Sequence, residues 1–112
     1  GGGPPPHIHR HEDETFYVLE CEVEFLLGDR TFPGSPGDFV NVPRGTLHRF
    51  HNPGSATARL ILTFTPAGIE RFFEETLERA DDLDQSPPDN IELVAARYAE
   101  AAPRYGIEFS AA

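Results

Sequence analysis

The sequence contains a single cysteine, Cys21, and no long run of apolar residues. One cysteine cannot form a disulfide within the chain, so stability has to come from buried apolar side chains, helped by a metal ion or a partner subunit where one binds. No stretch approaches the roughly 20 apolar residues that cross a bilayer, and the first residues lack the basic and apolar regions of a secretory signal. These absences argue against a membrane protein and predict a cytoplasmic one.

Positive charge is also scarce. Nine arginines, with no lysine, face nineteen aspartates and glutamates, which gives a formal net charge of -10. A surface of this sign repels the phosphate backbone of nucleic acids, and no local cluster of arginines offsets it. We therefore expect no nucleic-acid partner.

Glycine and proline are abundant instead, with 10 Gly and 11 Pro among 112 residues, while the hydrophobic fraction is 38%. A chain of this length forms one domain, and its composition favours many turns around a modest core. The composition changes at Pro66, because residues 1–66 hold most of the glycine and proline and all five histidines. We expect a β-rich core over 1–66 and a helical extension over 67–112, which packs on that core or on a partner subunit.

Short segments rich in Phe, Val, Leu and Ile are separated by turn residues: 15–19, 23–27, 39–42, 46–50 and 59–65. The pair Gly28-Asp29 predicts a tight hairpin, and the proline- and glycine-rich stretches 33–37 and 52–55 cannot continue a strand ladder. Such short connections require antiparallel pairing. The segments therefore predict a β-sandwich or barrel.

The second part of the chain changes to the helical period. Apolar residues over 69–80 recur at helical spacing, with glutamates on the opposite face. A polar stretch follows, and Asp89 with Glu92 forms a capping-box pattern before a second, shorter helix that ends near Pro103. We expect both helices to cover the β core or a dimer surface.

Three histidines and one carboxylate are spaced as metal ligands would be. His7 and His9 are two residues apart, so on a strand both side chains project from the same face. A turn through residues 10–13 lets Glu14 begin the neighbouring antiparallel strand and face the same interior, and a closing sheet brings His48 opposite. Three nitrogens and one carboxylate oxygen suit Fe, Mn, Ni, Co, Cu or Zn, so we predict one divalent transition metal per chain. Positions left open on that ion favour a catalytic site.

Other polar residues near these four compete less well for the same site. His11 shares the parity of His7 and His9 but lies in the polar turn, where a solvated side chain is expected. Glu12 is an alternative to Glu14 as the carboxylate ligand, but its spacing fits less well. His51 follows His48 by three residues, so on a strand it points to the other face.

The same residues form two spaced motifs, Gly1-x5-His7-x-His9-x4-Glu14-x6-Cys21 and Gly37-x5-Pro43-x-Gly45-x2-His48-x3-Asn52. They resemble the two motifs of the cupin superfamily, and the first departs from the family pattern at Cys21, where the family has Gly. The resemblance implies a mostly β fold, a cupin (double-stranded β-helix, jelly-roll-like) barrel with C-terminal α-helices. It also implies metal ligation by His7, His9, Glu14 and His48.

Around both motifs the chain resembles small single-domain cupins of the quercetin 2,3-dioxygenase-like group. This implies a metal-dependent dioxygenase that acts on a hydroxylated aromatic or enolic small molecule, flavonol-like, with dioxygen, and a homodimer. Glu14 would be a ligand and would also take the substrate's hydroxyl proton, which needs a carboxylate of raised pKa in a dry cavity. The candidate lining of the substrate pocket consists of phenylalanines: Phe16, Phe25, Phe39, Phe50 and Phe64.

Two alternative functions stay open. The first is a non-redox reaction, isomerisation, cyclisation or decarboxylation, in which the metal acts only as a Lewis acid. The second is a non-catalytic module that binds a small molecule, although the full ligand set counts against it. The fold cannot decide among them, because one fold hosts many functions.

Cys21 and the first residues carry two further expectations. Gly at the corner held by Cys21 would supply a positive φ, so either the turn differs or some backbone strain is tolerated there. A lone cysteine is most often a small buried apolar residue. A cupin barrel normally has strands before its first motif, so we expect these strands to be missing from the chain or the edge to be completed by a partner.

Overall fold

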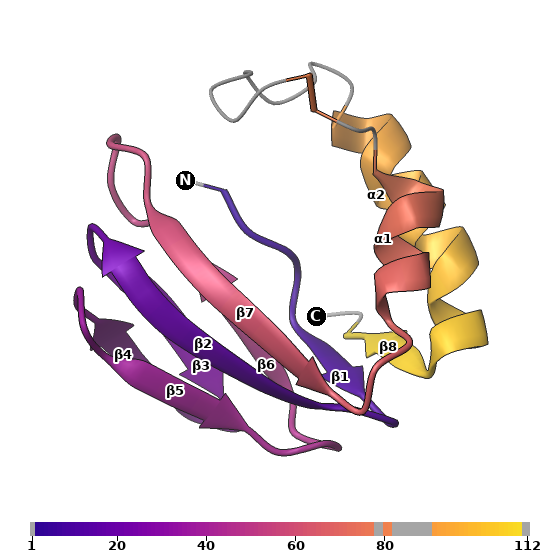
Figure 1. The fold of residues 1–112 in the computed structure, drawn as a ribbon, viewed down its shortest axis with the longest axis horizontal. Helices are drawn as coiled ribbons and strands as arrows, with labels where there is room; N and C mark the ends of the chain where they lie inside the picture. Colours follow the sequence, from indigo (N-terminus) through magenta and orange to yellow (C-terminus); the bar gives the residue numbers. More distant parts are fainter. Residues whose placement is uncertain (1, 78–79, 82–90, 111–112) are drawn as a thin grey trace.

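A computed structural model describes residues 2–77, 80–81 and 91–110 of the chain. Its strands are β1 (His7–His9), β2 (Asp13–Glu20), β3 (Val23–Leu27), β4 (Arg30–Gly34), β5 (Phe39–Val42), β6 (His48–His51), β7 (Arg59–Thr65) and β8 (Ile107–Phe109). The helices are α1 (Glu70–Thr76), α2 (Ile91–Ala101) and a 3-10 turn, η1 (Ala102–Tyr105). The predicted mostly β fold with helices near the C-terminus is confirmed (Figure 1).

Two antiparallel sheets face each other. One has the strand order β4-β3-β6-β1-β8 and the other has the order β5-β2-β7. The hairpin predicted at Gly28-Asp29 is present, because Leu27 pairs with Arg30 across it. The five predicted segments all contain strands, although β6 begins at His48 rather than at residue 46. Strands β4 and β8 were not among the predicted segments, because their sequences are short or polar and contain no run of apolar residues.

The core between the sheets comes from strict alternation along the strands. Phe16 and Val18 on β2 meet Val23 and Phe25 on β3, and each is at most 2% exposed. Strand β5 alternates in the same way, which buries Val40 and Val42 and turns the neighbouring side chains outward. This positioning follows from the two-residue period of a strand.

Phe39 differs from the other predicted pocket residues because its ring faces outward. It is 65% exposed on the outer face of the three-stranded sheet, beside Tyr17 across the ladder. The expectation that Phe39 lines an interior pocket is corrected, because Val40, one residue later, holds the inward parity.

Both helices differ from the expectation at their ends. Helix α1 stops at Thr76, because Leu77 is already extended (φ -108, ψ 149), whereas the periodicity predicted a helix to Ala80. Glutamates in its last turn, with no basic residue there, oppose the helix dipole and favour an early end. Helix α2 is present where the second helix was predicted, but with 11 residues against 7 in α1 it is the longer of the two rather than the shorter. The capping residue Asp89 lies outside the described residues.

The helices form a second apolar cluster beside the sandwich. Ile69 and Phe72 pack with Ala101, Ala102 and Ile107, and half-buried aromatic rings surround them. Figure 1 shows α1 and α2 side by side next to the end of β7. Strand β8 then pairs with β1, so the last described residues extend the five-stranded sheet. No helix in the described part of the chain is long and apolar enough to cross a membrane.

Cys21 occupies the corner between β2 and β3 with φ 62, a left-handed conformation that favours glycine. Of the two readings left open by the sequence, the strained corner is therefore the one adopted. The side chain is exposed, so the expectation of a small buried residue is wrong.

Candidate metal centre

The four predicted ligands meet between the two sheets. His7 and His9 project from the same face of β1, and His7 is in register with His48 on the neighbouring strand β6. Glu14 reaches them from β2 in the opposing sheet. The expected arrangement, with Glu14 on the neighbouring strand and His48 opposite, is therefore reversed. One ligand atom from each residue lies within 4.8 Å of the others, and all four side chains are buried.

Backbone carbonyls orient two of the imidazoles. The Nδ1 of His7 lies 2.8 Å from the Pro5 carbonyl oxygen, and the Nδ1 of His48 lies 2.9 Å from that of Thr46. A carbonyl oxygen only accepts hydrogen bonds, so each Nδ1 carries the proton. In a neutral ring the other nitrogen, Nε2, is then left with a lone pair that is free to bind a cation.

The Nε2 lone pair of His48 is aimed at a carboxylate. It lies 2.9 Å from Oε2 of Glu14, and the Nε2 of His9 lies 3.3 Å from the same oxygen. A neutral imidazole nitrogen and an ionised carboxylate oxygen repel each other at this distance unless a proton or a cation lies between them. The geometry therefore calls for a proton or a metal ion between these atoms.

Electrostatics favour a neutral His7 and an ionised Glu14 here. Burial lowers the pKa of His7 to about 4, and the neighbouring His48 adds to the shift, so His7 is neutral near pH 7. Burial alone would raise the pKa of Glu14, but hydrogen bonds with His48 and His9, which form when Nε2 of either ring carries a proton, outweigh it and lower that pKa. The lowered pKa is opposite to the raised value expected for a general base.

This donor set fits a divalent transition metal. Three imidazole nitrogens and one anionic oxygen converge, and these donors are in the form that binds metal, neutral for His7 and ionised for Glu14. Two of the rings are already held in the required tautomer by the chain itself.

An apolar pocket of about 500 Å³ lies between β7 and α1, and none of the four candidate ligands lines it. It is lined by Leu62, Phe64, Ala67, Ile69, Glu70 and Phe73. The Phe64 ring is 5.5 Å from the His9 ring, and Phe64 pairs in register with Glu14. Phe64 is therefore the pocket residue that contacts the candidate metal centre.

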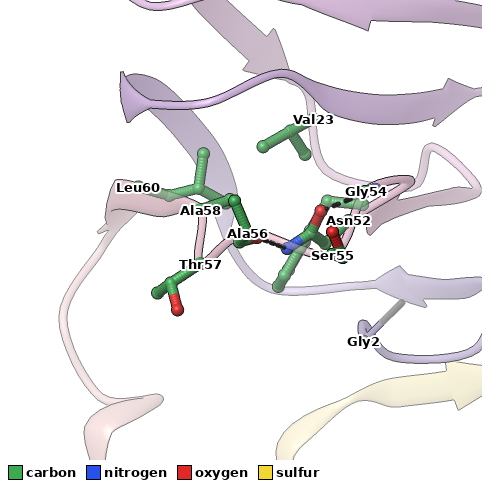
Figure 2. Close-up of a pocket in the computed structure, with 10 residues that line it drawn as sticks. Gly2, Val23, Asn52, Gly54, Ser55, Ala56, Thr57, Ala58 and Leu60 are labelled. Carbon is green, nitrogen blue, oxygen red and sulfur yellow. Dashed lines mark hydrogen bonds between the residues drawn. The ribbon is translucent and has the colours of Figure 1, made fainter. Parts of the chain in front are cut away.

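A second pocket, of about 360 Å³, lies at the other end of the sandwich around the loop between β6 and β7 (Figure 2). The Asn52 side chain donates to the Ala56 carbonyl and accepts from the Gly54 amide, so it shapes this loop. His48 starts β6, whereas this loop follows its last residue, His51. The second pocket is therefore separate from the metal centre.

The predicted pocket phenylalanines divide accordingly. Phe64 lines the pocket beside the centre, and Phe50 lines the loop pocket instead. Phe16 and Phe25 are sealed in the core, 1% and 2% exposed, and line neither pocket. Chain alternation alone could not distinguish a core ring from a pocket ring, because both face inward.

Sequence reasoning considered Glu12 only as a rival ligand to Glu14, and the structure gives it another place. Its side chain is buried, only 7% exposed, and its Oε1 lies 3.8 Å from the Nδ1 of His9. The available signal was the acidic run at residues 12–14, which places carboxylates on both faces of the chain as β2 begins. His11, expected to be solvated, is exposed.

Comparison with known proteins agrees with the fold. The family model described as Cupin domain matches residues 1–64. Quercetin 2,3-dioxygenase from Bacillus subtilis (strain 168) is 31% identical over 67 residues, which are 60% of this chain and 20% of that protein. The chain therefore spans about a fifth of the length of this relative.

Two solved structures share the fold. KdgF from Halomonas sp. superposes with a TM-score of 0.56 and 27% identity, over 63% of this chain and 64% of its own. A sugar phosphate isomerase of the cupin superfamily from Silicibacter pomeroyi superposes with a TM-score of 0.55 and 27% identity, over 60% and 45%. The relatives thus differ in the reactions that their names give.

Proposed function

The chain belongs to the cupin family, and from this premise we propose that it is a metal-dependent dioxygenase acting on a hydroxylated aromatic or enolic small molecule. His7, His9, His48 and Glu14 hold one divalent transition metal. The observation that carries the proposal is the convergence of four buried donor atoms, one from each residue, within 4.8 Å of one another.

The bound metal supplies Lewis acidity toward a substrate oxygen and a position for dioxygen. The chain itself supplies orientation. Phe64 lies beside His9 and, with Leu62, gives the pocket an apolar wall that accepts a flat ring. The pocket volume of about 500 Å³ is within the range of sites for molecules of flavonol size.

Glu14 acts first as a ligand. Its lowered pKa makes it a good anionic donor and a weak base, so ligation is the role that the electrostatics favour. The 31% identity to a quercetin 2,3-dioxygenase supports the substrate class, a hydroxylated aromatic or enolic molecule.

The second candidate is a non-redox isomerase, cyclase or decarboxylase. The superposition on a sugar phosphate isomerase favours it. The lining of the pocket speaks against a phosphorylated substrate, because its charged residue is Glu70 and no arginine lines it among the described residues. A phosphate group needs positive donors, which this pocket does not offer.

A non-catalytic binding module is the third candidate. The complete and buried ligand set counts against it, because a pure binder would lose nothing by replacing the ligands. Homodimerisation and a cytoplasmic location remain predictions, the former testable by sedimentation of the purified chain.

Oxygen uptake on a panel of flavonols tests the proposal, with the protein loaded separately with Mn, Fe, Co, Ni, Cu and Zn. We expect uptake that matches flavonol loss with at least one metal, and none with His48→Ala. Phe64→Ala should raise KM while Phe39→Ala, on the outer sheet face, leaves turnover unchanged. Substrate conversion without oxygen uptake would support the second candidate, and flavonol binding without conversion would support the third.

A further inference from the structure

The ring of His9 lies between two carboxylates. Its Nε2 is 3.3 Å from Oε2 of Glu14 at the centre, and its Nδ1 is 3.8 Å from Oε1 of Glu12 on the outer side. Both atoms of the outer pair are buried and lack a hydrogen-bond partner. Two orphaned polar atoms that face each other are uncommon in a folded protein, because each unmade hydrogen bond is costly.

The other two ligand imidazoles show that Nδ1 normally has a hydrogen-bond acceptor. His7 and His48 each direct Nδ1 to the carbonyl oxygen two residues earlier in the chain. For His9 that carbonyl belongs to His7, which lies between β6 and β8 and is paired on both sides. The backbone groups of His7 therefore form the hydrogen bonds of the sheet. The acceptor for the Nδ1–H group of His9 has to be a side chain.

The turn before β2 places Glu12 for this task. On one side the Arg10 amide donates to the Gly106 carbonyl at 2.8 Å, and on the other the Asp13 carboxylate accepts from the Arg44 amide at 2.8 Å. These contacts hold both ends of the turn and keep the Glu12 side chain inside. A movement of about 1 Å brings its oxygen to hydrogen-bond distance from the Nδ1 of His9.

We propose that Glu12 is a positioning residue. It accepts a hydrogen bond from the Nδ1–H group of His9 and thereby fixes the tautomer that presents Nε2 to the metal. The inference rests on the proposed metal site. An imidazole without such a partner populates the wrong tautomer and rotates, so fewer of its conformations bind. Glu12 thus completes a set in which each ligand histidine is held from behind by an oxygen.

Zinc affinity, measured by competition with a chelator at fixed pH, tests this role. Glu12→Leu removes the acceptor and should weaken zinc binding roughly 10- to 100-fold, whereas Glu12→Gln keeps an oxygen of the same reach and should retain most of the affinity. Glu22→Gln, on the exposed corner before β3, is the control for loss of one charge and should bind as the wild type does.

A second readout separates positioning from a structural role. Long-range nitrogen–proton NMR spectra of the zinc-loaded protein report the His9 tautomer. The wild type and Glu12→Gln should show a protected Nδ1 proton, and Glu12→Leu should lose it. If Glu12→Leu does not fold by circular dichroism, Glu12→Asp replaces it, because the shorter side chain keeps the charge and loses the reach.

Equal zinc affinity in the wild type and Glu12→Leu would overturn the inference while leaving the metal site intact. An equal loss in Glu12→Leu and Glu12→Gln with an unchanged His9 resonance would also overturn it, because charge or packing would then be the cause. A wild type that binds no divalent metal would overturn the inference and the proposed function together.

Discussion

The Nε2 of His48 lies 2.9 Å from Oε2 of Glu14, although 34 residues separate them in the chain and their strands belong to different sheets. The contact exists only when the two sheets face each other, so the metal centre and the tertiary fold depend on the same packing. A cation at the centre should therefore stabilise the folded state, because the unfolded chain holds no such site.

Metal addition should raise the thermal midpoint of the wild type. At a metal concentration about 1,000 times Kd, the gain in free energy of unfolding is about 4 kcal/mol. His48→Ala should lose this gain and should purify with far less than the one ion per chain expected for the wild type. Elemental analysis and calorimetric melting check both, and a wild type that is insensitive to every divalent metal would contradict the prediction.

Truncation of the core rings should be costly. Phe16→Ala and Phe25→Ala each remove a fully buried ring and should lower the free energy of unfolding by about 3–5 kcal/mol. Phe39→Ala is the matched control on the outer sheet face, with an expected change of about 0.5 kcal/mol or less. Urea unfolding measures all three, and a large loss for Phe39→Ala would show that its exposed face is covered.

Replacement of Cys21 should stabilise the protein when the new residue is glycine. The φ of 62 strains any side chain with a Cβ, so Cys21→Gly should gain about 0.5–1 kcal/mol after the entropy that glycine adds to the unfolded state. Cys21→Ala keeps the strain and should be nearly neutral. The two variants are compared by denaturant unfolding under reducing conditions, and a less stable Cys21→Gly would refute the strain argument.

Glu75 should contribute stability that disappears in acid. Its carboxylate accepts from Arg104 at 3.0 and 3.1 Å, and hydrogen bonds with Tyr105 and Arg104 lower its pKa below the ordinary 4.5. A lowered folded-state pKa means that the contribution is fully present above about pH 4.5 and is lost as pH falls through the folded value.

The difference in unfolding free energy between the wild type and Glu75→Gln should therefore be larger at pH 7 than at pH 3. Glu74→Gln, on the exposed neighbouring position of α1, should show no such pH dependence. A difference for Glu75→Gln that is the same at both pH values would exclude an ionic origin.

Much of the fold was predictable from local pattern. The two-residue spacing of His7 and His9 places both side chains on one face wherever that strand lies, and Gly28-Asp29 can form only a tight turn between its flanking strands. Helical periodicity located α1 and α2, but the end of α1 at Thr76 depended on charges at the helix end and on the chain that follows. Strand β8 was not predictable, because three residues form a strand only when β1 offers an edge.

The sequence by itself determined which residues can act as ligands, their parity along the strands and the turns between them, since these properties are local. Only the tertiary structure decided which inward rings seal the core and which border a pocket, as Phe16 and Phe64 illustrate. It also decided that Glu12 and Glu14 stand on opposite sides of the same imidazole. The physical reason is that such contacts join separate strands, and their geometry follows from how two sheets pack.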